Sequence, residues 1–255
     1  MESSERQDMI LAIARSSGRV LVEDLATRFA VTPQTIRRDL NDLCERHLLA
    51  RTHGGAVVTS NVENVAYAAR RTIGEAEKRA IGQAAAALVP DNCSLFINIG
   101  TTTEEVAKAL KGHRDLLVIT NNLHVAIELY PNPAIEVIVA GGQVRHEDGA
   151  IIGLSAIDLI GQFNVDLAVI GASGIDPDGT LLDFDYQEVR ISQAIIKNAR
   201  RVVLVCDHSK VGRAAPVRIG HIEQVDVFVT DTLSSPDLAL ACAAANIQVI
   251  EAAKL

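Results

Sequence analysis

The sequence predicts an α/β protein in two parts: a small N-terminal module of three helices and a β-wing, and a larger domain on a mainly parallel sheet. One observation is the close succession of apolar stripes at helical spacing within the first 57 residues. The other is a series of Val/Ile/Leu runs beyond residue 93 that alternate with helical patterns, as in a parallel sheet covered on both faces. We therefore expect a module at 1–57, a polar connector at 58–75 and an α/β domain at 76–255.

The helices of the small module follow from the spacing of their apolar residues. An apolar stripe opens at residues 10–13 and ends at Gly18, and residues 22–29 give a second, shorter helix. Thr32 is a suitable N-cap for a third helix, and Pro33 suits its first turn. Apolar residues at 36, 40 and 43 then lie on one face of that helix. Two helices joined by a tight turn at 29–31 are typical of a helix-turn-helix.

The remaining faces of the third helix carry polar side chains. Gln, Thr, Arg and Asn at the start of such a helix can contact base edges and phosphates in a DNA major groove. The alternative is an ordinary surface helix that carries two arginines. We predict DNA contacts from Thr32, Gln34, Thr35, Arg37, Arg38 and Asn41.

A β-wing is predicted after the third helix, where two short extended runs flank a Gly-Gly pair. Arg51 and His53 would then lie near a phosphate backbone. Residues 6–57, with Thr-Pro-Gln-Thr-Ile-Arg-Arg-Asp-Leu at 32–40 and Arg-Thr-His-Gly-Gly-Ala at 51–56, resemble the winged helix-turn-helix of DeoR-type bacterial repressors. The resemblance implies a partner, double-stranded operator DNA.

The net charge of −8 argues at first against nucleic acid, but it is unevenly spread. Residues 1–57 carry eight basic and eight acidic residues, against 24 and 32 in the whole chain, so the deficit lies entirely beyond residue 57. A neutral module remains compatible with DNA binding if Arg37, Arg38 and Arg51 share a face.

Cysteine spacing and hydropathy argue against a metal-binding, a secreted or a membrane protein. The four cysteines form no C-x-x-C pair, which predicts reduced thiols and no metal site. The N-terminus has no signal-peptide pattern, and no apolar run reaches about 18 residues. We therefore expect a cytoplasmic protein without a membrane partner.

The strands of the larger domain are predicted from short apolar runs, and most of them end in small or polar residues. A helix over about 77–88 stops before Pro90. Two further helices are expected to follow the first two strands and to end at about 110 and 130. Others are expected over about 186–199 and near 236–245. The strands are expected at 93–99, 116–120, 135–140, 166–170, 202–206, 227–231 and 247–250.

Ligands in such folds bind at the carboxyl ends of the strands. Residues 100–103 follow the first strand and offer a glycine, hydroxyls and a helix start, which together suit a phosphate. The alternative is a simple capped turn, and the other strand ends could also be turns or a solvated charge. The candidates for binding a small anion are Gly100, Thr101, Thr102, Thr103, Asn121, Asn122, Gly141, Gly142, Ser173, Gly174 and Lys210.

These strand ends are also similar to the effector domain of DeoR-type repressors. The resemblance implies a fold related to sugar-phosphate isomerases, a phosphorylated effector, no cofactor, and a homo-oligomer, either dimer or tetramer. The Asp-Phe-Asp-Tyr-x-Glu-Val-Arg run at 183–190 resembles members that regulate glycerol metabolism, which implies release from the operator by glycerol 3-phosphate. It adds Asp183, Asp185 and Glu188 as candidates for the hydroxyl end of the effector. These acids could instead only cap the helix that starts near Tyr186.

An enzyme is the rival hypothesis for the larger domain. No G-x-G-x-x-G follows a strand, no Walker A motif is present, and Gly153-x-Ser155 lacks the second glycine of a nucleophile elbow. An isomerase needs a carboxylate base beside its phosphate site, which one of the three acids at 183–188 could supply. The DNA-reading module in the same chain favours a sensor over an enzyme, and another sugar phosphate remains an alternative effector.

Overall fold

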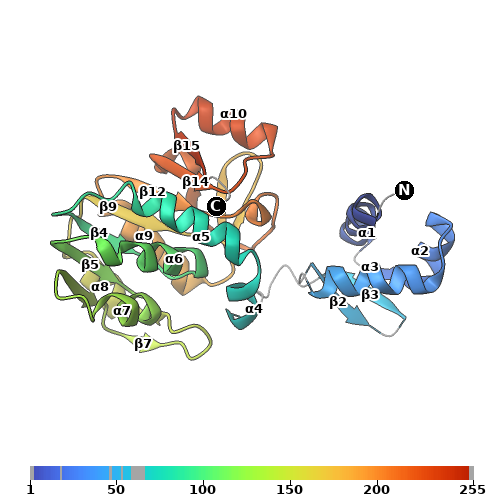
Figure 1. The fold of residues 1–255 in the computed structure, drawn as a ribbon, viewed down its shortest axis with the longest axis horizontal. Helices are drawn as coiled ribbons and strands as arrows, with labels where there is room; N and C mark the ends of the chain where they lie inside the picture. The colour runs from blue at the N-terminus through green and yellow to red at the C-terminus, as the bar shows by residue number, and fades with distance from the viewer. Residues whose placement is uncertain (1–2, 18, 46–47, 53, 59–66, 253–255) are drawn as a thin grey trace. The chain divides into compact units, whose positions relative to one another are not determined.

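The structure, a computed structural model, describes residues 3–252 except 18, 46–47, 53 and 59–66. The chain divides into two compact units, Met1–Val65 and Ala66–Leu255. The first is a winged helix-turn-helix and the second is an α/β unit with a parallel sheet (Figure 1), so the predicted fold class is confirmed.

The N-terminal unit contains a short three-stranded antiparallel sheet of order β1-β3-β2 beside its helices. A left-handed residue, Ala30, ends α2 and makes the tight turn into α3. Gly55 lies where β3 pairs with β1, and a Cβ there would approach the Val20 carbonyl oxygen to 2.0 Å, so only glycine fits. The elements are α1 (Ser3–Ser17), β1 (Arg19–Leu21), α2 (Val22–Phe29), α3 (Pro33–Glu45), β2 (Leu49–Thr52) and β3 (Gly55–Val58).

A buried core and a buried ion pair hold the described residues of this unit together. The apolar stripe of α3, Ile36, Leu40 and Leu43, is fully buried in that core. Arg6 on α1 reaches Asp39 on α3 through Nε–Oδ2 (2.5 Å) and Nη2–Oδ1 (3.2 Å) contacts. This pair fixes the back of α3 against α1, so its opposite face is the one presented to solvent.

The C-terminal unit is organised around a seven-stranded parallel sheet of order β15-β14-β12-β9-β4-β5-β6. Its strands are β4 (Ser94–Ile97), β5 (Leu116–Thr120), β6 (Ile135–Val139), β9 (Leu167–Ile170), β12 (Val202–Val205), β14 (Val227–Thr230) and β15 (Gln248–Glu251). The helices are α4 (Tyr67–Thr72), α5 (Glu75–Ala86), α6 (Thr101–Ala109), α7 (Leu123–Leu129), α8 (Leu154–Ile160), α9 (Tyr186–Lys197) and α10 (Pro236–Ala244), with short 3₁₀ turns η1 (Leu110–Gly112), η2 (His208–Lys210) and η3 (Ile222–Gln224).

Helices cover both faces of this sheet, as its apolar strands require. Successive side chains of a strand point to opposite faces, so Leu95 and Ile97 enter one core and Phe96 enters the other. The first core is closed by α5, α6 and α7, and the second by α8, α9 and α10. All seven central strands were predicted within one or two residues of their observed bounds.

Two small antiparallel additions were not predicted from the sequence. One is a three-stranded sheet of β10 (Gly174–Ile175), β11 (Thr180–Asp183) and β13 (Val217–His221). The other is a hairpin of β7 (Gln143–Val144) and β8 (Ile151–Ile152). Both additions place residues near the carboxyl ends of the central strands, where they complete the candidate site.

Three kinds of feature are absent from the described residues: membrane-spanning helices, metal sites and disulfides. No helix among them is long and apolar enough to cross a membrane. Within the same residues, no group of His, Cys, Asp and Glu side chains is arranged to hold a metal ion, and no disulfide joins the four cysteines.

Candidate functional site

The solvent face of α3 in the N-terminal unit carries the predicted DNA-reading side chains. Arg37 and Arg38 are exposed and make no hydrogen bond or ion pair with any described residue. Gln34 and Asn41 are exposed on the same helix. These four groups are therefore available to a partner molecule, whereas the apolar stripe behind them is buried.

Thr32 and Thr35, two of the predicted DNA contacts, bond to each other at the start of α3. Thr32 Oγ1 accepts a hydrogen bond from the Thr35 backbone N–H (3.2 Å) and lies 2.9 Å from Thr35 Oγ1. This arrangement is the expected N-cap. In the wing, Arg51 lies in β2 and nothing is described of its side chain, while His53 lies outside the described residues.

A cleft in the C-terminal unit lies at the carboxyl ends of three adjacent strands, β12, β9 and β4. The loops that follow these strands meet there because parallel strands end at one edge of a sheet. The lining residues are Arg70, Ile99, Gly100, Thr101, Thr102, Thr103, Gly171, Ala172, Ser173, Asp183, Glu188, Val205 and Lys210.

The loop after β4 forms one wall of this cleft. Gly100 has φ +144°, a conformation that other residues rarely adopt, and it precedes the first turn of α6. Thr103 Oγ1 donates to the carbonyls of Asn98 (2.8 Å) and Gly100 (2.7 Å), so it fixes the turn. The hydroxyls of Thr101 and Thr102 have no hydrogen-bond partner among the described residues. Together with the free N–H groups of the first helical turn, they suit an oxyanion.

Lys210 supplies a positive charge to the cleft from the 3₁₀ turn after β12. Its ammonium makes no hydrogen bond or ion pair with any described residue. Burial lowers the pKa of Lys210 to about 8, and Asp207 only partly offsets this effect. A half-buried ammonium without a counter-ion would gain from a bound anion.

The opposite wall of the cleft is acidic. Asp183 is buried at the end of β11, where its Oδ1 accepts hydrogen bonds from Ser173 Oγ (3.0 Å) and the Phe184 N–H (2.6 Å). Burial raises the pKa of Asp183. Burial and the nearby Asp183 also raise the pKa of Glu188, to about 8. Two carboxyl groups with raised pKa values can donate or accept hydrogen bonds, as the hydroxyls of a polyol require.

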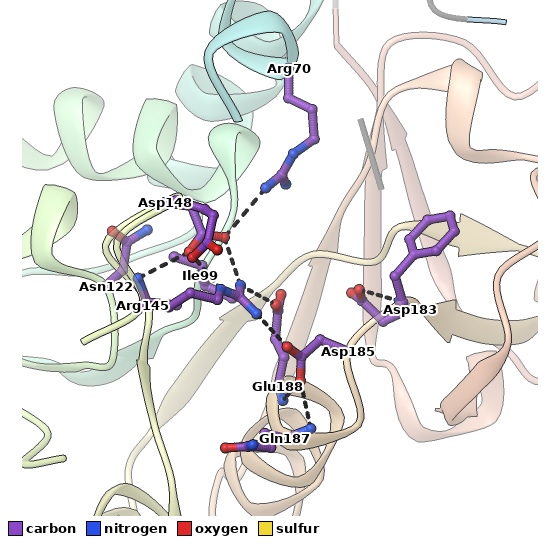
Figure 2. Close-up of polar contacts among 12 residues, drawn as sticks. Arg70, Ile99, Asn122, Arg145, Asp148, Asp183, Asp185, Gln187 and Glu188 are labelled. Carbon is purple, nitrogen blue, oxygen red and sulfur yellow. Dashed lines mark hydrogen bonds and ion pairs between the residues drawn. The ribbon is translucent and has the colours of Figure 1, made fainter. Parts of the chain in front are cut away.

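Arg145, between the hairpin strands β7 and β8, organises three carboxylates beside this wall (Figure 2). Its guanidinium contacts Asp148 through Nε–Oδ1 (2.8 Å) and Nη2–Oδ2 (2.6 Å). It also contacts Asp185 Oδ2 (2.6 Å) and Glu188 Oε2 (2.7 Å). Arg145 was not predicted as a site residue, because its partners lie up to 43 residues away in the sequence.

Asp185 has the capping role that was the alternative for these acids. Its Oδ1 accepts from the backbone N–H groups of Gln187 (2.7 Å) and Glu188 (3.1 Å), which makes it the N-cap of α9. Its other oxygen is held by Arg145. Asp185 does not line the cleft. Its contacts are those of a helix cap and of an ion-pair partner of Arg145.

Five other predicted residues also lie away from the cleft lining. Asn122 caps α7 by accepting from the His124 N–H (2.9 Å), and a Cβ on Gly174 would meet the Arg213 carbonyl oxygen at 2.0 Å. A Cβ on Gly142 would likewise meet the Ile152 carbonyl oxygen at 2.6 Å, and Asn121 Nδ2 donates to the Ile151 carbonyl (3.4 Å). The five are Asn121, Asn122, Gly141, Gly142 and Gly174.

Comparison with known proteins shows two matching families. Residues 6–62 match the DeoR-like helix-turn-helix domain, and residues 74–232 match the DeoR C terminal sensor domain. The chain is 46% identical over 231 residues to the "Glycerol-3-phosphate regulon repressor" of Escherichia coli (strain K12), covering 91% of this chain and 92% of that protein. It is 40% identical over 233 residues to the "HTH-type transcriptional repressor CsqR" of the same organism, covering 91% and 89%.

Among solved structures, a ribose 5-phosphate isomerase from Plasmodium falciparum matches 52% of each chain at 13% identity, with a TM-score of 0.39.

Proposed function

Because the chain belongs to the DeoR family of helix-turn-helix regulators, we propose that it represses genes of glycerol 3-phosphate metabolism and is released from its operator by that metabolite. The observation that carries the proposal is the cleft of the C-terminal unit. It combines the start of α6 and the Lys210 ammonium, which has no partner within the described part of the chain, with a pair of acids, Asp183 and Glu188. A phosphoryl group at the basic end would leave the hydroxyls of a short polyol facing the acidic end.

The proposed partners follow from the same premise. The exposed face of α3 would contact operator DNA, and a symmetric operator would require at least two copies of the chain. We infer a homo-oligomer, dimer or tetramer, that works in the cytoplasm without a cofactor. For the effector to release the DNA, it must bind the two states of the protein with different affinities.

Effector identity is tested by calorimetric titration of the full chain. Glycerol 3-phosphate is expected to bind, and glycerol or inorganic phosphate alone to bind far more weakly, because each occupies only one end of the cleft. Fructose 1-phosphate and fructose 6-phosphate serve as competitors of the same charge. A preference for either hexose phosphate would overturn the assigned effector and would leave the repressor assignment intact.

Thr102→Val is expected to weaken glycerol 3-phosphate binding roughly tenfold or more, because hydrogen bonds to charged groups contribute about 1.5–3 kcal/mol. The Thr102 hydroxyl makes no other hydrogen bond with the described residues, so the loop should keep its shape. Calorimetry measures the affinity, and operator binding should stay unchanged. Thr102→Ser keeps the hydroxyl and is the matched control. Normal induction of the valine variant would remove this hydroxyl from the site.

Effector affinity is expected to be highest between about pH 6 and pH 8. Below about pH 6 a phosphate monoester loses its second negative charge. Above about pH 8 Lys210 loses its proton, and the deprotonated Glu188 then adds a negative charge to the cleft. Both changes weaken binding of an anion, so the affinity should fall as the pH rises from 8 to 9.

Titrations at several pH values measure this profile, and two variants separate its causes. Lys210→Gln should bind weakly at every pH and lose most of the fall above pH 8. Glu188→Gln should keep the part of the fall that Lys210 causes. An affinity that is flat from pH 7 to pH 9 in the parent chain would contradict a charged Lys210 in the site.

A further inference from the structure

The short helix α4 is the first element of the C-terminal unit, and it follows directly on the segment that leads from the N-terminal unit. A six-residue helix is too short to be stable by itself, so contacts with the rest of its unit must hold it. Lys78 on α5 donates through its buried Nζ to the carbonyls of Arg70 and Ile73, the latter at 2.6 Å. Tyr67 donates through its hydroxyl to Glu104 Oε2 on α6 (2.9 Å). From the sequence, this stretch was predicted only as part of a connector.

Arg70 extends from α4 into the cleft and lines it together with the α6 loop and Lys210. Figure 2 shows its guanidinium pointing from the helix toward Asp148. The single ion pair is long, with Nη2 at 3.4 Å from Asp148 Oδ2. The Nε atom is buried and has no hydrogen-bond partner among the described residues. A planar guanidinium with five donors thus has a buried, unsatisfied Nε–H and one long ion pair beside a site that suits an oxyanion.

Asp148 does not depend on Arg70 for its charge balance. Arg145 already holds both of its oxygens, at 2.8 and 2.6 Å. Losing the long contact to Arg70 would therefore cost Asp148 little, whereas Arg70 would gain a charge-assisted, bidentate interaction with a phosphoryl group.

We propose that Arg70 binds the phosphoryl group of the effector in exchange for Asp148, and that α4 shifts or loosens as a result. This inference rests on the proposed function, because it assumes a phosphorylated effector in the cleft. It adds a binding residue outside the loops of the parallel sheet. It also gives the effector a direct contact with α4, the first helix of the C-terminal unit, so occupancy of the cleft biases the position of that helix.

The first test compares two adjacent arginines of α4 in the full chain. Arg70→Gln is expected to weaken glycerol 3-phosphate binding at least tenfold in calorimetry, with Arg70→Lys intermediate. Arg71→Gln is the matched control, because Arg71 lies the same 5.9 Å from the Tyr67 ring but does not line this cleft. Its effector affinity should stay within twofold of the parent.

The second test measures hydrogen exchange of the α4 backbone amides with and without saturating glycerol 3-phosphate. Exchange in α4 should change on binding in the parent and in Arg71→Gln, and should not change in saturated Arg70→Gln. This inference alone is overturned if the parent binds glycerol 3-phosphate and Arg70→Gln binds it equally well. It is also overturned if the parent binds glycerol 3-phosphate and the exchange of α4 stays constant. A parent that binds no glycerol 3-phosphate overturns the proposed function, and the inference with it.

Discussion

Replacing Arg145 by alanine is expected to destabilise the C-terminal unit by about 3–5 kcal/mol, the range for removing one partner from a buried ion pair. Arg145 is the shared counter-ion of Asp148, Asp185 and Glu188. Its side chain is 18% exposed, and that of Asp148 is 4% exposed, so water screens this cluster poorly. Without Arg145, Asp148 would keep only the 3.4 Å ion pair with Arg70 among the described residues, and Asp185 and Glu188 would lose their ion pairs with Arg145.

Urea unfolding of the parent and the variant at pH 7.5 and at about pH 3 measures this effect. Arg145 lowers the pKa of Asp148 below its usual value of 3.8, so the contribution of this carboxylate to stability is present above about pH 4 and is lost only at lower pH. The variant lacks that contribution, so the difference between the two proteins should shrink as the pH falls.

Two further variants calibrate the result. Arg145→Lys should be intermediate, because an ammonium cannot reproduce the planar fork. Arg190→Ala, at an exposed arginine of α9, should change the free energy of unfolding by less than about 0.5 kcal/mol. An Arg145→Ala protein as stable as the Arg190→Ala control would show that solvent, not Arg145, neutralises the cluster.

Arg37→Ala and Arg38→Ala are each expected to weaken operator binding by about 1–3 kcal/mol, the usual cost of one specific arginine contact. Both side chains are exposed on α3 and lack partners among the described residues, so neither change should alter stability. Fluorescence anisotropy with an operator duplex selected by the parent chain gives the affinity.

The salt dependence of operator binding separates the two kinds of contact. A variant that has lost a phosphate contact should show a salt slope smaller by about one, and a variant that has lost a base contact should keep the slope but relax sequence preference. Arg79→Ala, on an exposed face of α5, is the control. Parent-like operator binding by both α3 variants would mean that another element reads the DNA.

Local patterns were sufficient to predict the central fold. The helix predicted after Thr32 is observed as α3, Pro33–Glu45. Its N-cap and its apolar stripe are local features, so both can be recognised in the sequence. The run at 116–120 is β5, because continuous apolar residues suit a strand buried on both faces. The small sheet of β10, β11 and β13 was missed, because two- to five-residue strands leave little pattern and β11 pairs with residues about 35–40 positions later.

Several of the predicted residues come together in the candidate cleft for the same reason. Gly100–Thr103 and Lys210 follow strands, and the strand order brings them to one cleft. Arg70 and Arg145 were missed because each lies in a polar stretch that resembles a connector or loop. Their positions depend on long-range contacts with Asp148, Asp185 and Glu188 that no local spacing encodes.

The strand order also has a consequence for synthesis on the ribosome. Among the described residues of the N-terminal unit, both strand pairs close within the first 58 residues, whereas the pairing of β4 with β9 joins Leu95 to Leu167. Local contacts form early and non-local parallel pairs form late. The DNA-reading unit can therefore fold on the nascent chain before the middle of the parallel sheet has been translated. We expect that, during each round of translation, a folded reading unit exists for a time without a folded C-terminal unit.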